Sequence, residues 1–180
     1  MNSSIPWVEK YRPDNFDNIV LDRNNEIIFN NIIDMNLVPN LLFYGPPGTG
    51  KTTTIINLIK KYQEKYNQVH KSLVIHLNAS DERGIEIIRS QIMQFINTKP
   101  LFATGIKFVI LDEVDYMTKN AQQALKCLLQ SYTENVKFCL ICNYISKIDE
   151  SLIKEFIRLK FNQLPRDKIY SFIENIADKE

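Results

Sequence analysis

The stretch GPPGTGKT, from Gly45 to Thr52, limits the possible folds of this sequence more than any other feature. It matches the pattern G-x-x-x-x-G-K-[S/T], in which a glycine-rich turn points backbone N–H groups at phosphates. The apolar stretch NLLFY precedes it, and a helical pattern from Lys51 to about Tyr66 follows it. This order of strand, loop and helix argues against a glycine- and proline-rich turn that only resembles a phosphate-binding loop.

We expect a nucleoside triphosphate to lie along this loop, where the start of the following helix adds partial positive charge. The Lys51 ammonium is expected to reach the β and γ phosphates, and the Thr52 hydroxyl to bind Mg²⁺. The residues expected to line the nucleotide are Gly45, Pro46, Pro47, Gly48, Thr49, Gly50, Lys51, Thr52 and Thr53.

Apolar stretches and helical patterns alternate along the chain. The expected strands are residues 40–44, 72–77, 107–112, 137–142 and 157–161. Apolar residues at helical spacing follow the second and third of these strands, and a last helix is expected from Arg166 to Asp178. This alternation predicts an α/β fold of the P-loop nucleoside triphosphatase class, with a five-stranded parallel sheet flanked by helices.

The strands also differ in how they should be buried. The first four are nearly all apolar, so we expect helices to cover both of their faces. The fifth alternates, and Ile157, Leu159 and Phe161 are expected to point inward.

Two acidic residues stand where the third strand ends. Asp112 and Glu113 follow an apolar run one strand–helix unit after the phosphate-binding loop. Because ligands of parallel sheets lie at the carboxyl ends of the strands, both acids are expected beside that loop. Asp112 would hold Mg²⁺, directly or through water, and Glu113 would orient and polarise an attacking water. Asp115 is expected to serve the loop or the start of the next helix.

Asn143 ends the fourth strand, FCLICN. An asparagine after a strand is usually a turn residue. Its position beside the other two strand ends favours a contact with the γ phosphate or the attacking water instead. Lys51, Asp112, Glu113 and Asn143 are therefore the expected catalytic group.

Two other classes of protein remain as alternatives to a nucleoside triphosphatase. A small-molecule kinase would need an acceptor pocket and a basic lid, and the sequence indicates neither. A catalytically inactive interaction module would be expected to lack Lys51, Asp112 or Glu113, and all three are present.

Charge and hydropathy limit which partners and locations are expected. The chain has 22 Lys and Arg against 21 Asp and Glu, so any basic patch for nucleic acid must be local. No apolar run approaches the length that spans a membrane. The N-terminus also lacks the apolar segment of a secretory signal.

The three cysteines are expected to be structural thiols of a reducing, intracellular compartment. Cys139 and Cys142 form C-x-x-C, but they lie in an apolar strand, where residues three apart point to opposite faces. No second Cys or His pair completes a zinc site with them or with Cys127.

Five segments together resemble the small subunits of replication factor C, the clamp loader of eukaryotes and archaea, within the AAA+ ATPases. They are WVEKYRP, GPPGTGKTT, LNASDERGI, LDEVDYMTKNAQQAL and FCLICNYISKI, and they cover nearly the whole chain. The stretch TENVKFCLICNYISKI most resembles the branch called subunit 3 in yeast and subunit 5 in humans. The resemblance implies an AAA+ nucleotide-binding domain in residues 1–164 and the start of a helical lid domain in residues 165–180.

The same resemblance implies ATP with Mg²⁺ as the ligand and ATP hydrolysis only within an assembly of five subunits. The implied function is loading a sliding clamp onto primer–template DNA in the nucleus. A related clamp-loader-like complex for checkpoint signalling or repair is an alternative, as is a subunit that binds ATP but barely hydrolyses it. A Holliday-junction helicase subunit is a more distant alternative, against which LNASDERG argues.

Family positions imply roles for further residues. Val8 and Arg12 would lie against the adenine and ribose. Arg83 and Arg89 match positions near the DNA channel, and each could instead be a solvated surface charge. Lys119 and Lys126 are weaker candidates for DNA contacts. Phe95 and Phe102 could face the sliding clamp, or they could be buried in the core.

The sequence departs from the family before its last strand. The family carries a Ser-Arg-Cys motif there, whose arginine reaches the neighbouring subunit's nucleotide. The corresponding residues are Lys154, Glu155 and Phe156. A carboxylate repels a γ phosphate, and Lys154 lacks the bidentate fork of arginine. We therefore expect an intact site in this chain and an incomplete one in its neighbour.

Members of the family also continue into a helical lid, which carries a sensor arginine, and into a collar domain. We therefore expect these 180 residues alone to hydrolyse ATP poorly and to assemble weakly.

Overall fold

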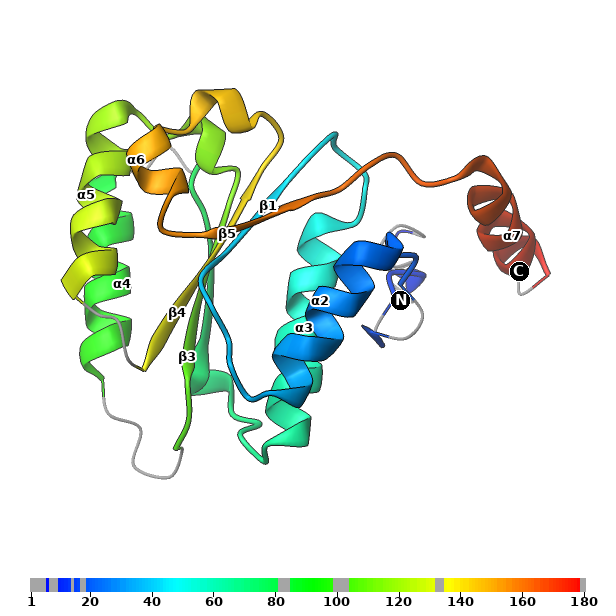
Figure 1. Cartoon of the computed structure of the whole chain (residues 1–180), viewed down its shortest axis with the longest axis horizontal. Helices are drawn as coiled ribbons and strands as arrows, with labels where there is room; N and C mark the ends of the chain where they lie inside the picture. The colour runs from blue at the N-terminus through cyan, green and yellow to red at the C-terminus, as the bar shows by residue number, and fades with distance from the viewer. Residues whose placement is uncertain are drawn as a thin grey trace, which may run out of the picture.

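Five parallel strands form one sheet at the centre of the structure, which is a computed structural model (Figure 1). It describes residues 6, 10–13, 15–16, 19–80, 85–98, 104–131 and 135–178. The strands are β1 (Leu41–Tyr44), β2 (Val74–Asn78), β3 (Lys107–Asp112), β4 (Val136–Cys142) and β5 (Ile157–Lys160). They lie side by side in the order β2-β3-β4-β1-β5, and every pair is parallel. The predicted α/β class is confirmed.

Helices cover both faces of this sheet (Figure 1). The helices are α2 (Arg23–Asp34), α3 (Lys51–Lys65), α4 (Ile85–Asn97), α5 (Lys119–Ser131), α6 (Glu150–Ile153) and α7 (Arg166–Ala177). Short 3₁₀ turns are η2 (Lys71–Leu73), η3 (Val114–Tyr116) and η4 (Ile145–Lys147). One apolar core lies between the sheet and α2 and α3, and a second lies between the sheet and α4 and α5.

Helix α2 is an element that the sequence patterns above do not include. Its four asparagines have low helix propensity, which weakens the local signal. Asp22 nevertheless caps its first turn, and the fully buried Phe29 packs its ring against those of Phe16 and Phe43. Tertiary burial therefore forms this helix and fixes it against β1.

The two edge strands are less buried than the sequence predicts. His76 and Asn78 of β2 are exposed, since this strand has a neighbour on one side only. Ile157, expected to point inward, is 46% exposed because it begins the other edge strand, β5. Leu159 and Phe161 are buried as predicted.

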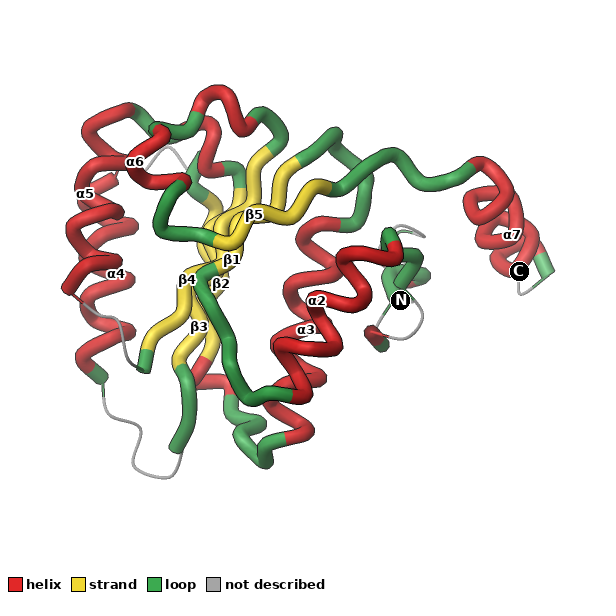
Figure 2. Tube along the Cα trace, viewed as in Figure 1, coloured by secondary structure: helices red, strands yellow, loops and turns green. Residues whose placement is uncertain are grey.

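Beyond β5 the chain leaves the sheet as a loop and ends in α7, which lies away from the strands (Figure 2). Four large apolar side chains of α7 are exposed: Ile169, Tyr170, Phe172 and Ile173. The division of the chain into residues 1–164 and 165–180 stays a prediction.

The two strand cysteines lie on opposite faces of β4, as predicted. Cys139 belongs to the core beside α2 and α3, and Cys142 to the core beside α4 and α5. Burial raises the pKa of both thiols to about 12, whereas Cys127 is exposed. The described residues contain no group of three or more His, Cys, Asp or Glu side chains that could hold a metal ion. None of the described helices is long and apolar enough to cross a membrane.

We expect a disulfide-exchange reagent to react rapidly with Cys127 alone in the folded chain, because the thiolate is the nucleophile and the other thiols are buried and protonated. Counting released reporter should give one thiol per folded chain and three after unfolding in guanidinium chloride. Cys127→Ser is the control and should abolish the fast reaction. Fast release of a second equivalent from the folded chain would contradict this burial.

Candidate functional site

The turn between β1 and α3 depends on glycine for close backbone packing at one position and for left-handed backbone at another. Gly45 has φ +145°, and a Cβ there would lie 2.0 Å from the carbonyl oxygen of Phe161. Gly50 is the N-cap of α3 in the left-handed region, with φ +84°. Because glycine has no side chain, the first N–H groups of α3 are not capped by the N-cap residue and remain able to bind an anion.

Lys51 connects this turn to the end of β4. The side chain is 6% exposed. Its Nζ donates to the carbonyl oxygens of Gly45 and Pro46, each at 2.8 Å. The same atom donates to Oδ1 of Asn143 at 2.9 Å. The structure therefore brings together two residues that were predicted separately from distant parts of the sequence.

The charge of Lys51 is held among acidic groups. Burial lowers the pKa of its ammonium, and the electrostatic influence of Cys142, Asp112 and Asp115 opposes that shift. A lysine ammonium at this position can form charge-assisted hydrogen bonds with phosphate oxygens.

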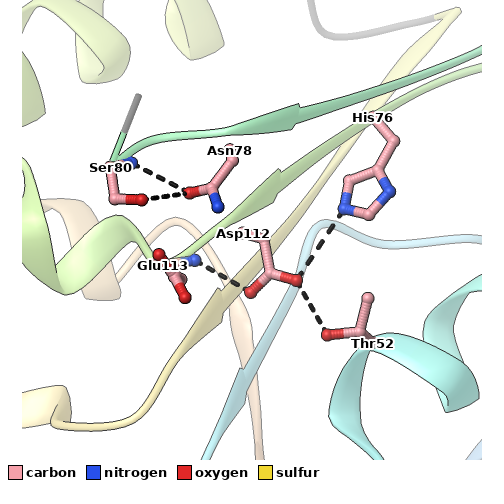
Figure 3. A network of polar contacts seen from close by, with 6 residues as sticks. All are labelled: Thr52, His76, Asn78, Ser80, Asp112 and Glu113. Atoms are coloured by element: carbon pink, nitrogen blue, oxygen red, sulfur yellow. Dashed lines mark hydrogen bonds and ion pairs between the residues drawn. The ribbon is translucent and has the colours of Figure 1, made fainter. Parts of the chain in front are cut away.

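Asp112 gathers donors from three elements (Figure 3). Its Oδ2 accepts from the Thr52 hydroxyl at 2.7 Å and lies 3.8 Å from Nε2 of His76, while Oδ1 accepts from the N–H of Glu113 at 2.9 Å. Burial by itself raises the pKa of Asp112, but the contacts from His76, Thr52 and Glu113 outweigh it and hold the pKa below its ordinary value. Oxygen atoms of this kind are the ligands that Mg²⁺ prefers, so Thr52 and Asp112 fit the ion expected from the sequence.

Glu113 stands at a sharp bend of the backbone. It has φ +56° and precedes the turn η3. This conformation is uncommon for a residue with a side chain, and such strain gathers at functional sites. The bend places Glu113 beside Asp112 at the cavity described below, as its predicted role requires.

Of the two roles expected for Asp115, in the loop or at the start of the next helix, the structure does not show the second. The Thr118 hydroxyl accepts from the N–H of Ala121 in the first turn of α5. Asp115 is instead buried, and its Oδ1 accepts from the N–H of Asn143 at 3.4 Å.

A cavity of about 600 Å³ joins these parts. Its walls include the phosphate loop from Pro47 to Thr53, the acids Asp112 and Glu113, and Asn143. Segments from both ends of the chain complete the walls. These are Tyr11, Arg12, Pro13, Phe172 and Ile176, and Ile141 of β4 also lines the cavity.

The cavity, and the surroundings of Asp112, contain residues that the sequence patterns did not predict there. Phe172 and Ile176 come from α7, whose helical spacing predicts a helix but not the surface against which it lies. His76 approaches Asp112 from the edge strand β2, and a polar residue within an apolar strand was the signal available for it.

The residues predicted from family positions have different outcomes. Val8, Arg83 and Phe102 fall outside the described residues. Arg12 lines the cavity, whereas Arg89 is exposed on α4, which covers one face of the sheet. The remaining candidates are Lys119, exposed on α5, Lys126, half-buried on α5, and Phe95, half-buried against the core of α4 and α5.

The sequence and the fold match known proteins. The sequence pattern of the AAA family, described as the ATPase family associated with various cellular activities, matches residues 41–163. Replication factor C subunit 3 of Schizosaccharomyces pombe is 43% identical over 99% of this chain and 51% of the relative. Replication factor C subunit 5 of Homo sapiens is 43% identical over 98% of this chain and 52% of the relative. The chain spans about half the length of these curated relatives, and the predicted resemblance is confirmed.

Among solved structures, the RuvB Holliday junction branch migration motor of Thermotoga maritima is similar with a TM-score of 0.74. The match covers 93% of this chain and 54% of that chain, at 13% sequence identity. At that identity the likeness shows the fold alone.

The two glycines Gly45 and Gly48 give a matched test of the loop geometry. Gly48→Ala should destabilise the fold by about 1–2 kcal/mol, because φ is +74° but nothing lies within 4 Å of the new Cβ. Gly45→Ala adds the overlap with Phe161, which should cost roughly 1–3 kcal/mol more. The free energy of unfolding in urea measures both. Equal losses in the two variants would contradict the close approach of Phe161 to Gly45.

Proposed function

The chain belongs to the AAA family of ATPases, and we propose that it is the ATP-binding part of a replication factor C small subunit, working with Mg²⁺. The observation that supports nucleotide binding most directly is the contact of Lys51 with both the phosphate loop and Asn143. This contact brings the Lys51 ammonium, the start of α3 and the Asn143 amide together at the wall of one cavity.

Different walls of the cavity have different roles in this proposal. The backbone of the loop from Gly45 to Thr53 binds the phosphates, and Thr52 and Asp112 would hold Mg²⁺. Arg12 lines the same cavity and is proposed to contact the adenine and ribose, a role also proposed for Val8. Phe172 and Ile176 add apolar side chains to the cavity wall, as an adenine ring requires.

Hydrolysis would use the residues at the strand ends. Glu113 orients the attacking water and accepts its proton, while Asn143 and Lys51 stabilise the charge that develops on the γ phosphate. The bound Mg²⁺ supplies further neutralisation of the phosphates. We propose that this reaction proceeds only when neighbouring subunits complete the site.

The clamp-loading role rests on the relatives, about half of whose length this chain matches. It implies partner subunits, a sliding clamp, primer–template DNA and a nuclear location. Arg83 and Arg89 are proposed as DNA contacts, with Lys119 and Lys126 as further candidates. A related checkpoint or repair complex would use the same site, so the partners distinguish the two functions.

Lys51→Ala tests nucleotide binding by this chain. Charge-assisted hydrogen bonds contribute about 1.5–3 kcal/mol, so affinity for ATP with Mg²⁺ should fall by roughly tenfold to 100-fold. Isothermal titration calorimetry measures the affinity, and circular dichroism verifies the fold. Lys60→Ala, an exposed lysine on the same helix, should bind like the wild type. The proposal fails if the wild type does not bind ATP or if Lys51→Ala binds as tightly.

Glu155 lies on the surface between α6 and β5, next to the exposed Lys154. This is the position where the family carries the arginine that reaches a neighbouring nucleotide. We propose that the acid leaves the adjoining site of the assembly without that arginine.

Glu155→Arg should raise ATP hydrolysis by the assembled complex, because an arginine supplied in trans can contribute on the order of 10³-fold at one site. The measurement is the steady-state rate of complexes made by co-expression with the partner subunits. Glu155→Gln is the matched control and removes only the repulsion, so it should give a much smaller gain. No difference between the Arg variant and the wild type would contradict the proposal.

A further inference from the structure

Asp115 is a buried carboxylate without a role in the proposed hydrolysis. Its side chain is 6% exposed. One oxygen, Oδ1, accepts from the N–H of Asn143, and Oδ2 accepts no hydrogen bond from the residues that the structure describes. A carboxylate in such a position is unfavourable unless neighbouring charges and donors offset its lost hydration. Its surroundings should therefore explain why it is there.

The first neighbour is the backbone of Asn143. The ladder between β1 and β4 ends at the pair Tyr44 and Cys142, so the N–H of Asn143 lies just beyond the last paired residue. Asp115 supplies an acceptor for it. This contact fixes the peptide from which the Asn143 side chain extends toward Lys51.

The contact reaches Lys51 through Asn143. The Lys51 ammonium donates from Nζ to Oδ1 of Asn143 at 2.9 Å. Asp115 accepts from the backbone N–H of the same residue, so its link to Lys51 runs through Asn143.

Asp115 also shares a turn with Glu113. The N–H of Tyr116 donates to the carbonyl of Glu113 at 3.0 Å, and that of Met117 donates to Val114 at 3.1 Å. These bonds close η3 into one compact unit. Asp115 is therefore separated from Glu113 at the cavity wall by one residue of tightly turned backbone, Val114.

We propose that Asp115 is a positioning residue that holds Asn143 toward Lys51 and links this pair to the turn carrying Glu113. Through this link, a contact of the γ phosphate with Asn143 is coupled to the position of the group that orients water. The inference rests on the nucleotide site proposed above. It predicts that Asp115 affects the binding of a nucleoside triphosphate more than that of a diphosphate.

A double-mutant cycle between Asp115 and Asn143 tests this inference. Affinities of the whole chain for ATPγS and for ADP, each with Mg²⁺, are measured for the wild type, Asp115→Asn, Asn143→Ala and the double variant. Asp115→Asn keeps the shape of the side chain and removes its charge. The contact with the N–H of Asn143 is long, at 3.4 Å, so its loss should lower ATPγS affinity about fivefold and leave ADP affinity within about twofold.

The cycle separates positioning from simple destabilisation. If Asp115 acts through Asn143, its effect on ATPγS should largely vanish in the Asn143→Ala background. Asp34→Asn removes an exposed carboxylate of α2 and is the matched control, with no expected effect on either nucleotide.

Three results would overturn the inference. The first is an equal loss of affinity for ATPγS and for ADP in Asp115→Asn. The second is a double variant whose loss of ATPγS affinity equals the product of the losses in the two single variants. The third is an unchanged ATPγS affinity in Asp115→Asn. In each case the wild type still binds nucleotide, so the proposed function stands. If the wild type binds neither nucleotide, the proposed function fails and the inference fails with it.

Discussion

The geometry of the site depends on the hydrogen bonds that the Lys51 ammonium donates. The ammonium is buried, and it donates to oxygens from the end of β1 and from the end of β4. These strands are neighbours in the sheet, and β3, which ends in Asp112, pairs with the other side of β4. Three consecutive strand ends therefore supply the phosphate loop, the amide and the acids. The strand order, which brings residues about a hundred positions apart into hydrogen-bond distance, is what makes the site possible.

The sequence predicts that Lys51, Asp112 and Asn143 lie close together, because each stands at the end of a strong local pattern. Lys51, Asp112 and Asn143 each lie at a boundary of a predicted strand or helix, and parallel strands bring such boundaries to one edge. No pattern predicts the strand order, and the sequence places His76 in an apolar strand without indicating that β2 is an edge. The same reason accounts for Ile157, since neighbours in the sheet decide whether a side chain is buried.

Elements that depend on long-range packing are the ones that the sequence does not predict. Helix α2 is formed by burial of Phe29 despite weak local propensity. The contribution of Phe172 and Ile176 to the cavity depends on where a loop carries α7. The cavity therefore combines two kinds of wall. The rigid ends of strands hold the groups for phosphate chemistry, and segments near the chain ends hold the apolar and cationic groups suited to a base and ribose.

The close approach of Phe161 to Gly45 affects how α7 can move. The N–H of Phe161 donates to the carbonyl of Tyr44, so the point where the chain leaves the sheet is fixed directly against the phosphate loop. Helix α7 has 12 residues and is therefore about 18 Å long. A rotation of ~10° about the loop from Asn162 to Pro165 would shift its far end by roughly 3 Å, by the geometry of a rigid rod of that length. A small change of tilt in the loop next to Gly45 is therefore enlarged along α7, whose residues Phe172 and Ile176 line the cavity.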